Sequence, residues 1–312
     1  MTKEIPLISI IMATYNRGHL IIESIEAIIQ QSYKEWECLI IDDGSTDETK
    51  KILDTYLDKD SRFKYFTRKN IYKKGLPGCR NMGLEIAQGN YVIFFDDDDI
   101  PHPDCLKWSI EEITTNNADY CRYLRTVFYN TLNKDFNREK DYKIIQYNLL
   151  PVESLITGKV PFNSCQVLWR AELFEEERFN EDLMFAEEWE LYTRILLKQP
   201  KGITIEKDLY YGRKHADSNT GEFKQANSIR VNSKIQAARL IIEHTSQAGN
   251  FSCSLAKFFI RMGFDLKSYS LINEALNKSN MDVLEKFKYR LGFIFYPILR
   301  PLLKLKGALK ST

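Results

Sequence analysis

The sequence predicts an α/β protein with a doubly wound, mostly parallel, Rossmann-like sheet and a helical C-terminal extension. Over the first hundred residues, short apolar stretches alternate with stretches of helical period, as in a parallel sheet connected by crossover helices. The stretch 91–95 holds only aromatic and branched apolar residues, which favours a central strand buried on both faces. Four aspartates, 96–99, follow it directly. We expect the strand to end there, because adjacent unpaired charges do not enter a core.

The composition is that of an ordinary globular protein, with 44% hydrophobic and 28% charged residues among 312. The net charge of +1 argues against nucleic acid as a partner. Six scattered cysteines form no Cys-x-x-Cys pair, which argues against a disulfide framework or a zinc site and favours a reducing cytosol. Residues 1–6 lack the pattern of a signal peptide, and no apolar run approaches the roughly 20 residues of a membrane span.

The first part of the predicted sheet comes from four apolar stretches separated by three helical ones. The helical repeat is clearest over 20–31, where isoleucines recur at helical spacing. Gly89 suits the C-terminus of the third helix. The expected strands are 7–12, 36–41, 63–66 and 91–95, and the expected helices are 20–31, 49–57 and 80–88.

Beyond the aspartates, the sequence predicts more helix and less strand. A turn at 100–104 leads to a helix that ends at Asn117, and residues 131–150 are interpreted as a loop because their periodicity is weak. The remaining expected elements are strands at 119–130 and 208–211, an apolar stretch at 162–169, an acidic loop at 174–185, a helix at 187–197 and helices within 222–279.

Acidic side chains follow two of these strands, and a polar loop follows the first. Asp42 and Asp43 come after the second strand, and Asp96–Asp99 come after the fourth. Because the carboxyl ends of parallel strands meet at one edge of a sheet, where ligands bind, we expect these side chains to share a site. Oxygen ligands of this kind favour Mg²⁺ or Mn²⁺. A solvated acidic turn is the alternative for the four aspartates, and capping of the next helix is a compatible role for the earlier pair.

Six motifs, taken in order, resemble those of the inverting family 2 glycosyltransferases with the GT-A fold. Each motif alone is moderately specific, whereas the ordered set is highly specific. The resemblance covers roughly the first 220 residues and implies nothing for the rest. The motifs are Thr14–Arg17, Asp42–Asp47, Gly78–Gly83, Asp96–Asp99, Glu187–Leu191 and Arg213–His215.

The resemblance implies a donor site and a metal site at the matching positions. Asp43 would accept the ring N–H of uracil, and Asp98 would hold Mn²⁺ or Mg²⁺ on the diphosphate. Asp96 would contact the ribose or the metal, and His215 would be a late metal or phosphate ligand. Lys74 lies where the family often has a cation for the base or the phosphate. The residues implied for nucleotide-sugar binding are Thr14, Tyr15, Asn16, Arg17, Asp43, Lys74, Arg80, Asp96 and Asp97.

The catalytic carboxylate is expected at Glu188, where the family usually has the aspartate that acts as general base. This sequence has Glu187–Glu188 in place of Glu-Asp, and the added methylene leaves open which of the two is the base. The other interpretation of both is a solvated first helical turn, which the helix dipole favours for acids. The chemistry agrees with the resemblance, because a leaving diphosphate needs a cationic stabiliser and an attacking hydroxyl needs a positioned base.

The implied activity is inverting transfer of one sugar from a UDP-hexose or UDP-N-acetylhexosamine to a hydroxyl of a glycan acceptor, in bacterial surface polysaccharide biosynthesis. A nucleotidyltransferase is one alternative, and it should carry a Gly-rich basic loop after the first strand. The loop here is Thr14–Arg17, which lacks that pattern. A non-catalytic nucleotide-sugar-binding protein is the other alternative, and the intact acids argue against it.

The chain is expected to divide into a catalytic domain at 1–220, a helical region at 221–285 and a basic amphipathic tail at 286–312. The tail carries seven cations and no acid around an apolar run, which favours contact with an anionic membrane surface. A lipid-linked acceptor and a location on the inner, cytoplasmic face of the plasma membrane would fit such a tail. Packing on the protein body or a homodimer contact is the alternative. Pro297 and Pro301 argue against a membrane-spanning helix.

Overall fold

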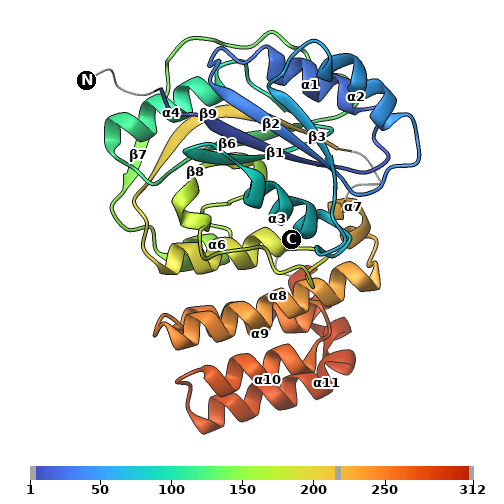
Figure 1. Cartoon of the computed structure of the whole chain (residues 1–312). Coiled ribbons are helices and arrows are strands. Elements are labelled where there is room, and N and C mark those ends of the chain that lie inside the picture. Colours follow the sequence, from blue (N-terminus) through green and yellow to red (C-terminus); the bar gives the residue numbers. More distant parts are fainter. Residues whose placement is uncertain (1–4, 215–218, 309–312) are drawn as a thin grey trace. The chain divides into compact units, whose positions relative to one another are not determined.

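The structure, a computed structural model, describes residues 5–214 and 219–308 (Figure 1). The chain divides into two compact units, residues 1–233 and 234–312. The boundary lies 13 residues beyond the predicted end of the catalytic domain at residue 220. The roles assigned to the three predicted segments stay predictions.

The first unit is built on a nine-stranded sheet whose strand order is β3-β2-β1-β4-β8-β6-β9-β5, with β7 paired to β9. The four strands of its first part are mutually parallel, as predicted. Their register aligns Thr14 with Asp42 and Ala13 with Asp96, so their polar carboxyl ends meet at one edge. These strands are β1 (Ile8–Thr14), β2 (Trp36–Asp42), β3 (Phe63–Thr67) and β4 (Tyr91–Asp96).

The strands after residue 100 extend the sheet with mixed directions. The strand β8 runs antiparallel between β4 and β6, whereas β9 is parallel to β6. The predicted turn at 100–104 begins with the short strand β5, and the predicted loop at 131–150 contains the strand β7. These strands are β5 (Ile100–Pro101), β6 (Tyr120–Phe128), β7 (Ile144–Tyr147), β8 (Val167–Arg170) and β9 (Gly202–Arg213).

Helices cover both faces of the parallel part of the sheet (Figure 1). Ile8, Ile10 and Met12 alternate toward one face, where they join a core with residues of α1, α2 and α4. Ile11 points to the other face, where it meets Gly83 of α3. The helices of this unit are α1 (Ile21–Ile29), α2 (Thr49–Leu57), α3 (Leu76–Ile86), α4 (Cys105–Asn116), α5 (Val152–Ile156), α6 (Glu187–Leu197) and α7 (Asn219–Lys224).

The helix α3 corrects one prediction, because it begins at Leu76 rather than at residue 80 and ends before Gly89. Pro77 suits the first turn of a helix, where its missing N–H is not needed. Gly89 does not end the helix. A Cβ there would lie 2.6 Å from the backbone nitrogen of Ser9, so glycine is required for the close approach of this connection to β1.

The second unit contains α9 (Cys253–Asp265), α10 (Tyr269–Lys278) and α11 (Val283–Ala308), and α8 (Ser228–Gln247) runs from the first unit into it. Phe293 of α11 packs inward, with its ring 5.5 Å from that of Phe264 and 5.6 Å from that of Tyr269. Among residues 5–214 and 219–308, no helix is long and apolar enough to cross a membrane. Side chains after Phe295 lie outside the described ones.

Candidate active site

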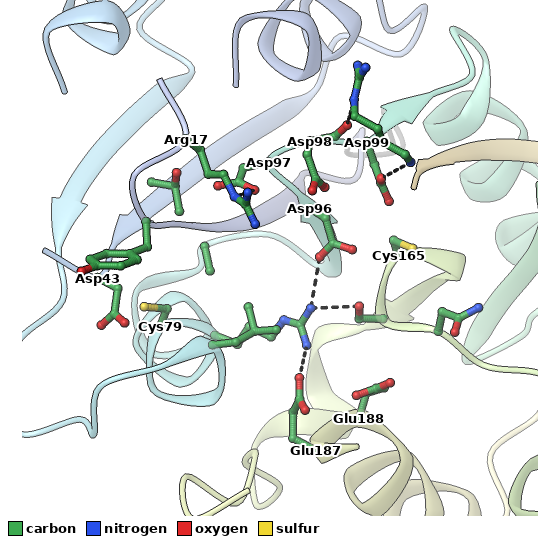
Figure 2. A pocket seen from close by; sticks show the side chains of 18 of the residues that line it. Arg17, Asp43, Cys79, Asp96, Asp97, Asp98, Asp99, Cys165, Glu187 and Glu188 are labelled. Atoms are coloured by element: carbon green, nitrogen blue, oxygen red, sulfur yellow. Dashed lines mark hydrogen bonds and ion pairs between the residues drawn. The ribbon is translucent and has the colours of Figure 1, made fainter. Parts of the chain in front are cut away.

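A cavity of about 360 Å³ opens at the carboxyl ends of the parallel strands (Figure 2). Its walls come from segments far apart in the sequence, as expected for the edge of an open α/β sheet. All of its lining residues belong to the first unit. The lining residues that the sequence predicted are Thr14, Tyr15, Arg17, Asp43, Arg80, Asp96, Asp97, Asp98, Glu187 and Glu188.

Asp42 and Asp43 have different environments although they are adjacent. Asp42 is buried, and its Oδ1 accepts hydrogen bonds from the backbone and the hydroxyl of Ser45, 2.8 and 2.7 Å away. Asp42 therefore closes the turn after β2 and does not cap α2, which begins only at Thr49. Asp43 lines the cavity, where Arg68 and the backbone N–H of Gly75 hold its two oxygens at 2.5 and 3.0 Å.

Tyr15 lines the cavity on the same side as Asp43, and Lys74 lies beside Tyr15. The ring of Tyr15 is 45% exposed, and the Nζ of Lys74 lies 4.7 Å from its centroid. Lys74 itself is not part of the lining. Asn16 is also absent from the lining, because its side chain accepts a hydrogen bond from the N–H of Thr46 at 2.8 Å and so organises the loop.

The four aspartates after β4 are not equivalent. Asp97 is buried with its Oδ1 3.7 Å from the Nε of Arg17, and burial together with Asp98 raises the pKa of Asp97 to about 7. Asp99 is also buried, and both of its oxygens are engaged: Oδ2 lies 3.2 Å from Nη2 of Arg125, and Oδ1 accepts from the N–H of Arg213 at 2.7 Å.

Asp96 and Asp98 are the two aspartates for which the resemblance implied a divalent cation, and this assignment stays a prediction. Their carboxylate oxygens are the hard ligands that Mn²⁺ and Mg²⁺ prefer, and both residues line the cavity. Asp96, Asp99 and Cys165 also bring one ligand atom each within 4.8 Å of one another, but Asp99 is already committed to Arg125 and Arg213. The predicted third ligand, His215, lies outside the described residues.

Arg80 ties Asp96 to the helix that carries the candidate base. Its guanidinium lies 3.1 Å from Oε1 of Glu187, 3.3 Å from Oδ1 of Asp96 and 2.9 Å from Oγ of Ser164. The side chain of Arg80 is only 4% exposed. Arg80 therefore braces two walls of the cavity, and the donor contact that the resemblance implied for it stays a prediction.

Glu187 and Glu188 begin α6 but serve different environments. Glu187 is buried against Arg80, and burial and the nearby Glu188 raise its pKa to about 7 despite the opposing effect of that guanidinium. Glu188 is half-buried and lines the cavity, to the side of Glu187 in Figure 2. Ala186 before them has a left-handed φ of 64°, a strained conformation for alanine that occurs often at functional sites.

Several residues in the lining were not predicted as site residues. Arg125 comes from the middle of β6, and Asn163, Ser164 and Cys165 come from the apolar stretch before β8. These positions carry no local signal, because only the non-local strand pairing brings them to the cavity. Arg213 and Lys214 were part of a matched motif, which is a signal that could have placed them here. Asp99 belongs to the predicted acidic run, and the other unpredicted lining residues are Ala13, Leu76, Cys79 and Phe185.

The fold and parts of the sequence are similar to those of known proteins. S. aureus TarS residues 1–349, solved in complex with UDP-GlcNAc, matches with a TM-score of 0.63 and 22% identity over 91% of this chain and 81% of that one. This likeness shows the fold and confirms the predicted GT-A class. Glycosyltransferase GlyG of Streptococcus pneumoniae is 28% identical over 223 residues, which are 68% of this chain and 72% of GlyG.

A further relative is WfgD of Escherichia coli, named as a UDP-Glc:alpha-D-GlcNAc-diphosphoundecaprenol beta-1,3-glucosyltransferase. It is 41% identical over 115 residues, which are 36% of this chain and 44% of WfgD, so the match spans less than half of that protein. The model of the family described as Glycosyl transferase family 2 matches residues 9–174. Because that match covers more than half of the 312 residues, the chain belongs to glycosyl transferase family 2, as its motifs indicated.

Proposed function

We propose that this family 2 glycosyltransferase moves one sugar from a UDP-linked donor, a UDP-hexose or a UDP-N-acetylhexosamine, to a hydroxyl of a glycan acceptor, with inversion at the anomeric carbon. One observation carries the proposal. A single cavity brings together a base-binding end at Tyr15 and Asp43, the cation-binding acids Asp96 and Asp98, and the carboxylate of Glu188. These are the groups that a nucleotide, its diphosphate and an attacking hydroxyl each require.

The nucleoside end of the donor would lie between the loops after β1 and β2. Tyr15 offers an exposed ring face, and Lys74 lies over that ring. Asp43 is fixed by Arg68 and Gly75, and each of its oxygens has a second lone pair that can accept a ring N–H. This pre-organised acceptor supports uracil as the base.

The diphosphate would lie beside Asp96 and Asp98, which would hold Mn²⁺ or Mg²⁺. When bound, such an ion neutralises the charge that develops on the leaving diphosphate. Arg80 fixes the position of Asp96 through the 3.3 Å contact. The deeply buried Asp97 is oriented toward Arg17 and supports the loop after β1.

The acceptor hydroxyl would lose its proton to Glu188. Glu187 is engaged by Arg80, whereas Glu188 has no ion-pair partner among the residues that the structure describes. A carboxylate at the rim of the cavity can reach a hydroxyl that enters from solvent, and one base assisting one displacement inverts the anomeric carbon. We therefore assign Glu188 as the base and Glu187 as the residue that positions Arg80.

A lipid-linked acceptor and a place on the inner face of the plasma membrane complete the proposal, in bacterial surface polysaccharide biosynthesis. The name of WfgD specifies a diphosphoundecaprenol acceptor, which is a lipid carrier. In this chain, one side of α11 exposes Val283, Leu284, Phe287, Ile294 and Phe295, and the cations of residues 286–312 accompany them. Apolar residues with flanking cations favour an anionic membrane surface.

The direct test is a panel of nucleotide sugars measured for Mn²⁺-dependent thermal stabilisation, followed by a transfer assay with the stabilising donor and lipid-linked acceptors. We expect one UDP-sugar to stabilise the protein and to be consumed only when an acceptor is present. Release of pyrophosphate from a nucleoside triphosphate and a sugar phosphate would instead indicate the nucleotidyltransferase alternative. Binding without any turnover would indicate the non-catalytic one.

A further inference from the structure

We infer that Arg125 binds the donor diphosphate directly, in addition to the divalent cation of the proposed function. We also infer that the missing side chain of Gly212 leaves the space that the guanidinium of Arg125 occupies. This inference rests on the proposed function and adds a residue that the motifs do not include. Arg125 lies in the middle of β6, yet it lines the cavity. Three features of the structure bring it there and leave it able to bind.

The first feature is the pairing of β6 with β9. The register between these parallel strands shifts twice, between Tyr123 and Leu124 and between Leu124 and Arg125. Such irregularities locally increase twist and redirect side chains next to active sites. They directly precede Arg125, whose side chain is 15% exposed and extends to the cavity.

The second feature is the absence of a side chain at Gly212 of β9. A Cβ built there would lie 1.7 Å from Nη2 and 2.1 Å from Cζ of Arg125. The guanidinium therefore occupies the space that any other residue at 212 would fill. Gly212 is not in the left-handed region that favours glycine, so the close approach of Arg125 is the reason for a glycine here.

The third feature is the set of partners that Arg125 has. Nη2 contacts Oδ2 of Asp99 at 3.2 Å, which fixes the guanidinium. Among the described residues, Nε has no hydrogen-bond acceptor, but it is buried, so the donors that a phosphate could reach are those of the terminal nitrogens. A guanidinium carries five N–H donors, so donors remain for the oxygens of a phosphate, and the planar fork suits phosphate geometry.

The charge balance of the cavity calls for such a group. Asp96 and Asp98 would neutralise the divalent cation that they hold, so the negative charge of the diphosphate would need further cations from the chain. The other arginines of the lining also have partners, as Arg125 has Asp99, and Lys214 is a further cation of the lining. Arg80 is a buried brace between Glu187 and Asp96, Arg17 faces Asp97, and the guanidinium of Arg213 contacts the carbonyl oxygens of Asp98 and Asn130.

The test compares binding of UDP and of uridine in the presence of Mn²⁺, by titration calorimetry and ligand-observed NMR. Arg125→Gln should weaken UDP binding by about 10- to 100-fold, as expected for loss of charged hydrogen bonds, and leave uridine binding unchanged. Gly212→Ala keeps the charge but displaces the guanidinium, so it should have the same selective effect. Arg122→Lys is the matched control, because Arg122 is a buried arginine of the same strand that does not line the cavity.

An affinity for UDP in Arg125→Gln equal to that of the wild type would overturn the inference. If Gly212→Ala does not fold, the result for Arg125→Gln alone decides whether the inference holds. An equal loss of UDP and uridine binding would also overturn it, because a general distortion of the site would then be the cause. A wild-type protein that does not bind UDP would contradict the proposed donor site and this inference with it. The expected variant instead loses UDP binding selectively while its stability in Mn²⁺ without donor equals that of the wild type. That result would support both the proposed donor site and this inference.

Discussion

Arg80 and Glu187 form a buried ion pair, with Nη1 of the arginine 3.1 Å from Oε1 of the glutamate. The two side chains are 4% and 6% exposed. This pair joins α3 to the start of α6, so the position of Glu188 depends on it. The pair also separates the roles of two adjacent carboxylates that the sequence left ambiguous.

Replacement of Arg80 tests this brace. Arg80→Ala should lower the free energy of unfolding by about 2 to 4 kcal/mol, because it leaves Glu187 and Asp96 without their buried partner. Chemical denaturation measures the change. The matched control is Lys50→Ala, which removes an exposed ion pair with Asp54 and should change stability by less than about 1 kcal/mol. Equal effects of the two substitutions would contradict the brace.

The raised pKa of Glu187 predicts a dependence of stability on pH. The pKa of Glu187 is about 7 in the folded state, whereas the ordinary pKa of a glutamate is 4.5, so the folded state binds more protons between these values. The contribution of Glu187 to stability is fully present below pH 4.5 and is lost as the pH rises through 7. Glu187→Gln removes the titration and should therefore gain stability relative to the wild type between pH 5 and pH 8. Parallel melting-temperature profiles for the two proteins would show that Glu187 has no such shift.

The assignment of Asp98 as a metal ligand predicts that its replacement removes both transfer and the dependence of UDP binding on Mn²⁺. Asp98→Ala should abolish transfer and remove the effect of Mn²⁺ on UDP binding, because the ion would lose a carboxylate ligand. Calorimetric titration of UDP with and without Mn²⁺ measures this, and Asp58→Asn at an exposed site after α2 serves as the control. Full activity of Asp98→Ala, or of the wild type in EDTA, would refute the role.

The exposed apolar residues of α11 predict that the protein binds to anionic membrane surfaces. Replacing Leu284, Phe287, Ile294 and Phe295 with Gln should reduce co-sedimentation with anionic vesicles, because buried apolar area contributes about 25 cal/mol per Å². The binding that remains should be abolished by salt, because it comes from cations at about 1 kcal/mol each. Tyr129→Gln with Leu149→Gln, at exposed positions of the first unit, is the control. Unchanged partitioning would favour packing or dimerisation for this surface.

Local sequence patterns predicted the bounds of helices and the position of the central buried strand. The helices α2 and α6 begin and end where their periodicity placed them, and the buried run 91–95 is a central strand that ends in the acids. Sequence periodicity did not give the bounds of strands that pair with strands distant in the sequence. The strand β9 begins at Gly202 instead of residue 208, because shifts in its register against β6 interrupt the alternation that marks a strand.

The site residues likewise divide into those with a local sequence signal and those without one. The acids at the strand ends could be found because charge directly follows apolar residues there. Arg125 and Cys165 could not, because a single arginine or cysteine within a strand-like stretch gives no indication of the face it will occupy. Arg80 was found from its motif, and its donor contact stays a prediction. Its contacts with Asp96 and Glu187 could not be predicted, because they are a property of the tertiary structure alone.

The most direct test of the account is the rate of transfer by Glu188→Gln. This substitution keeps the size of the side chain but removes its ability to accept a proton. We expect kcat to fall by about 10²-fold or more, with Mn²⁺-dependent UDP binding unchanged. Glu187→Gln is the adjacent control and should retain more activity than Glu188→Gln. A nearly normal kcat for Glu188→Gln together with a severe loss for Glu187→Gln would contradict the assignment of the base.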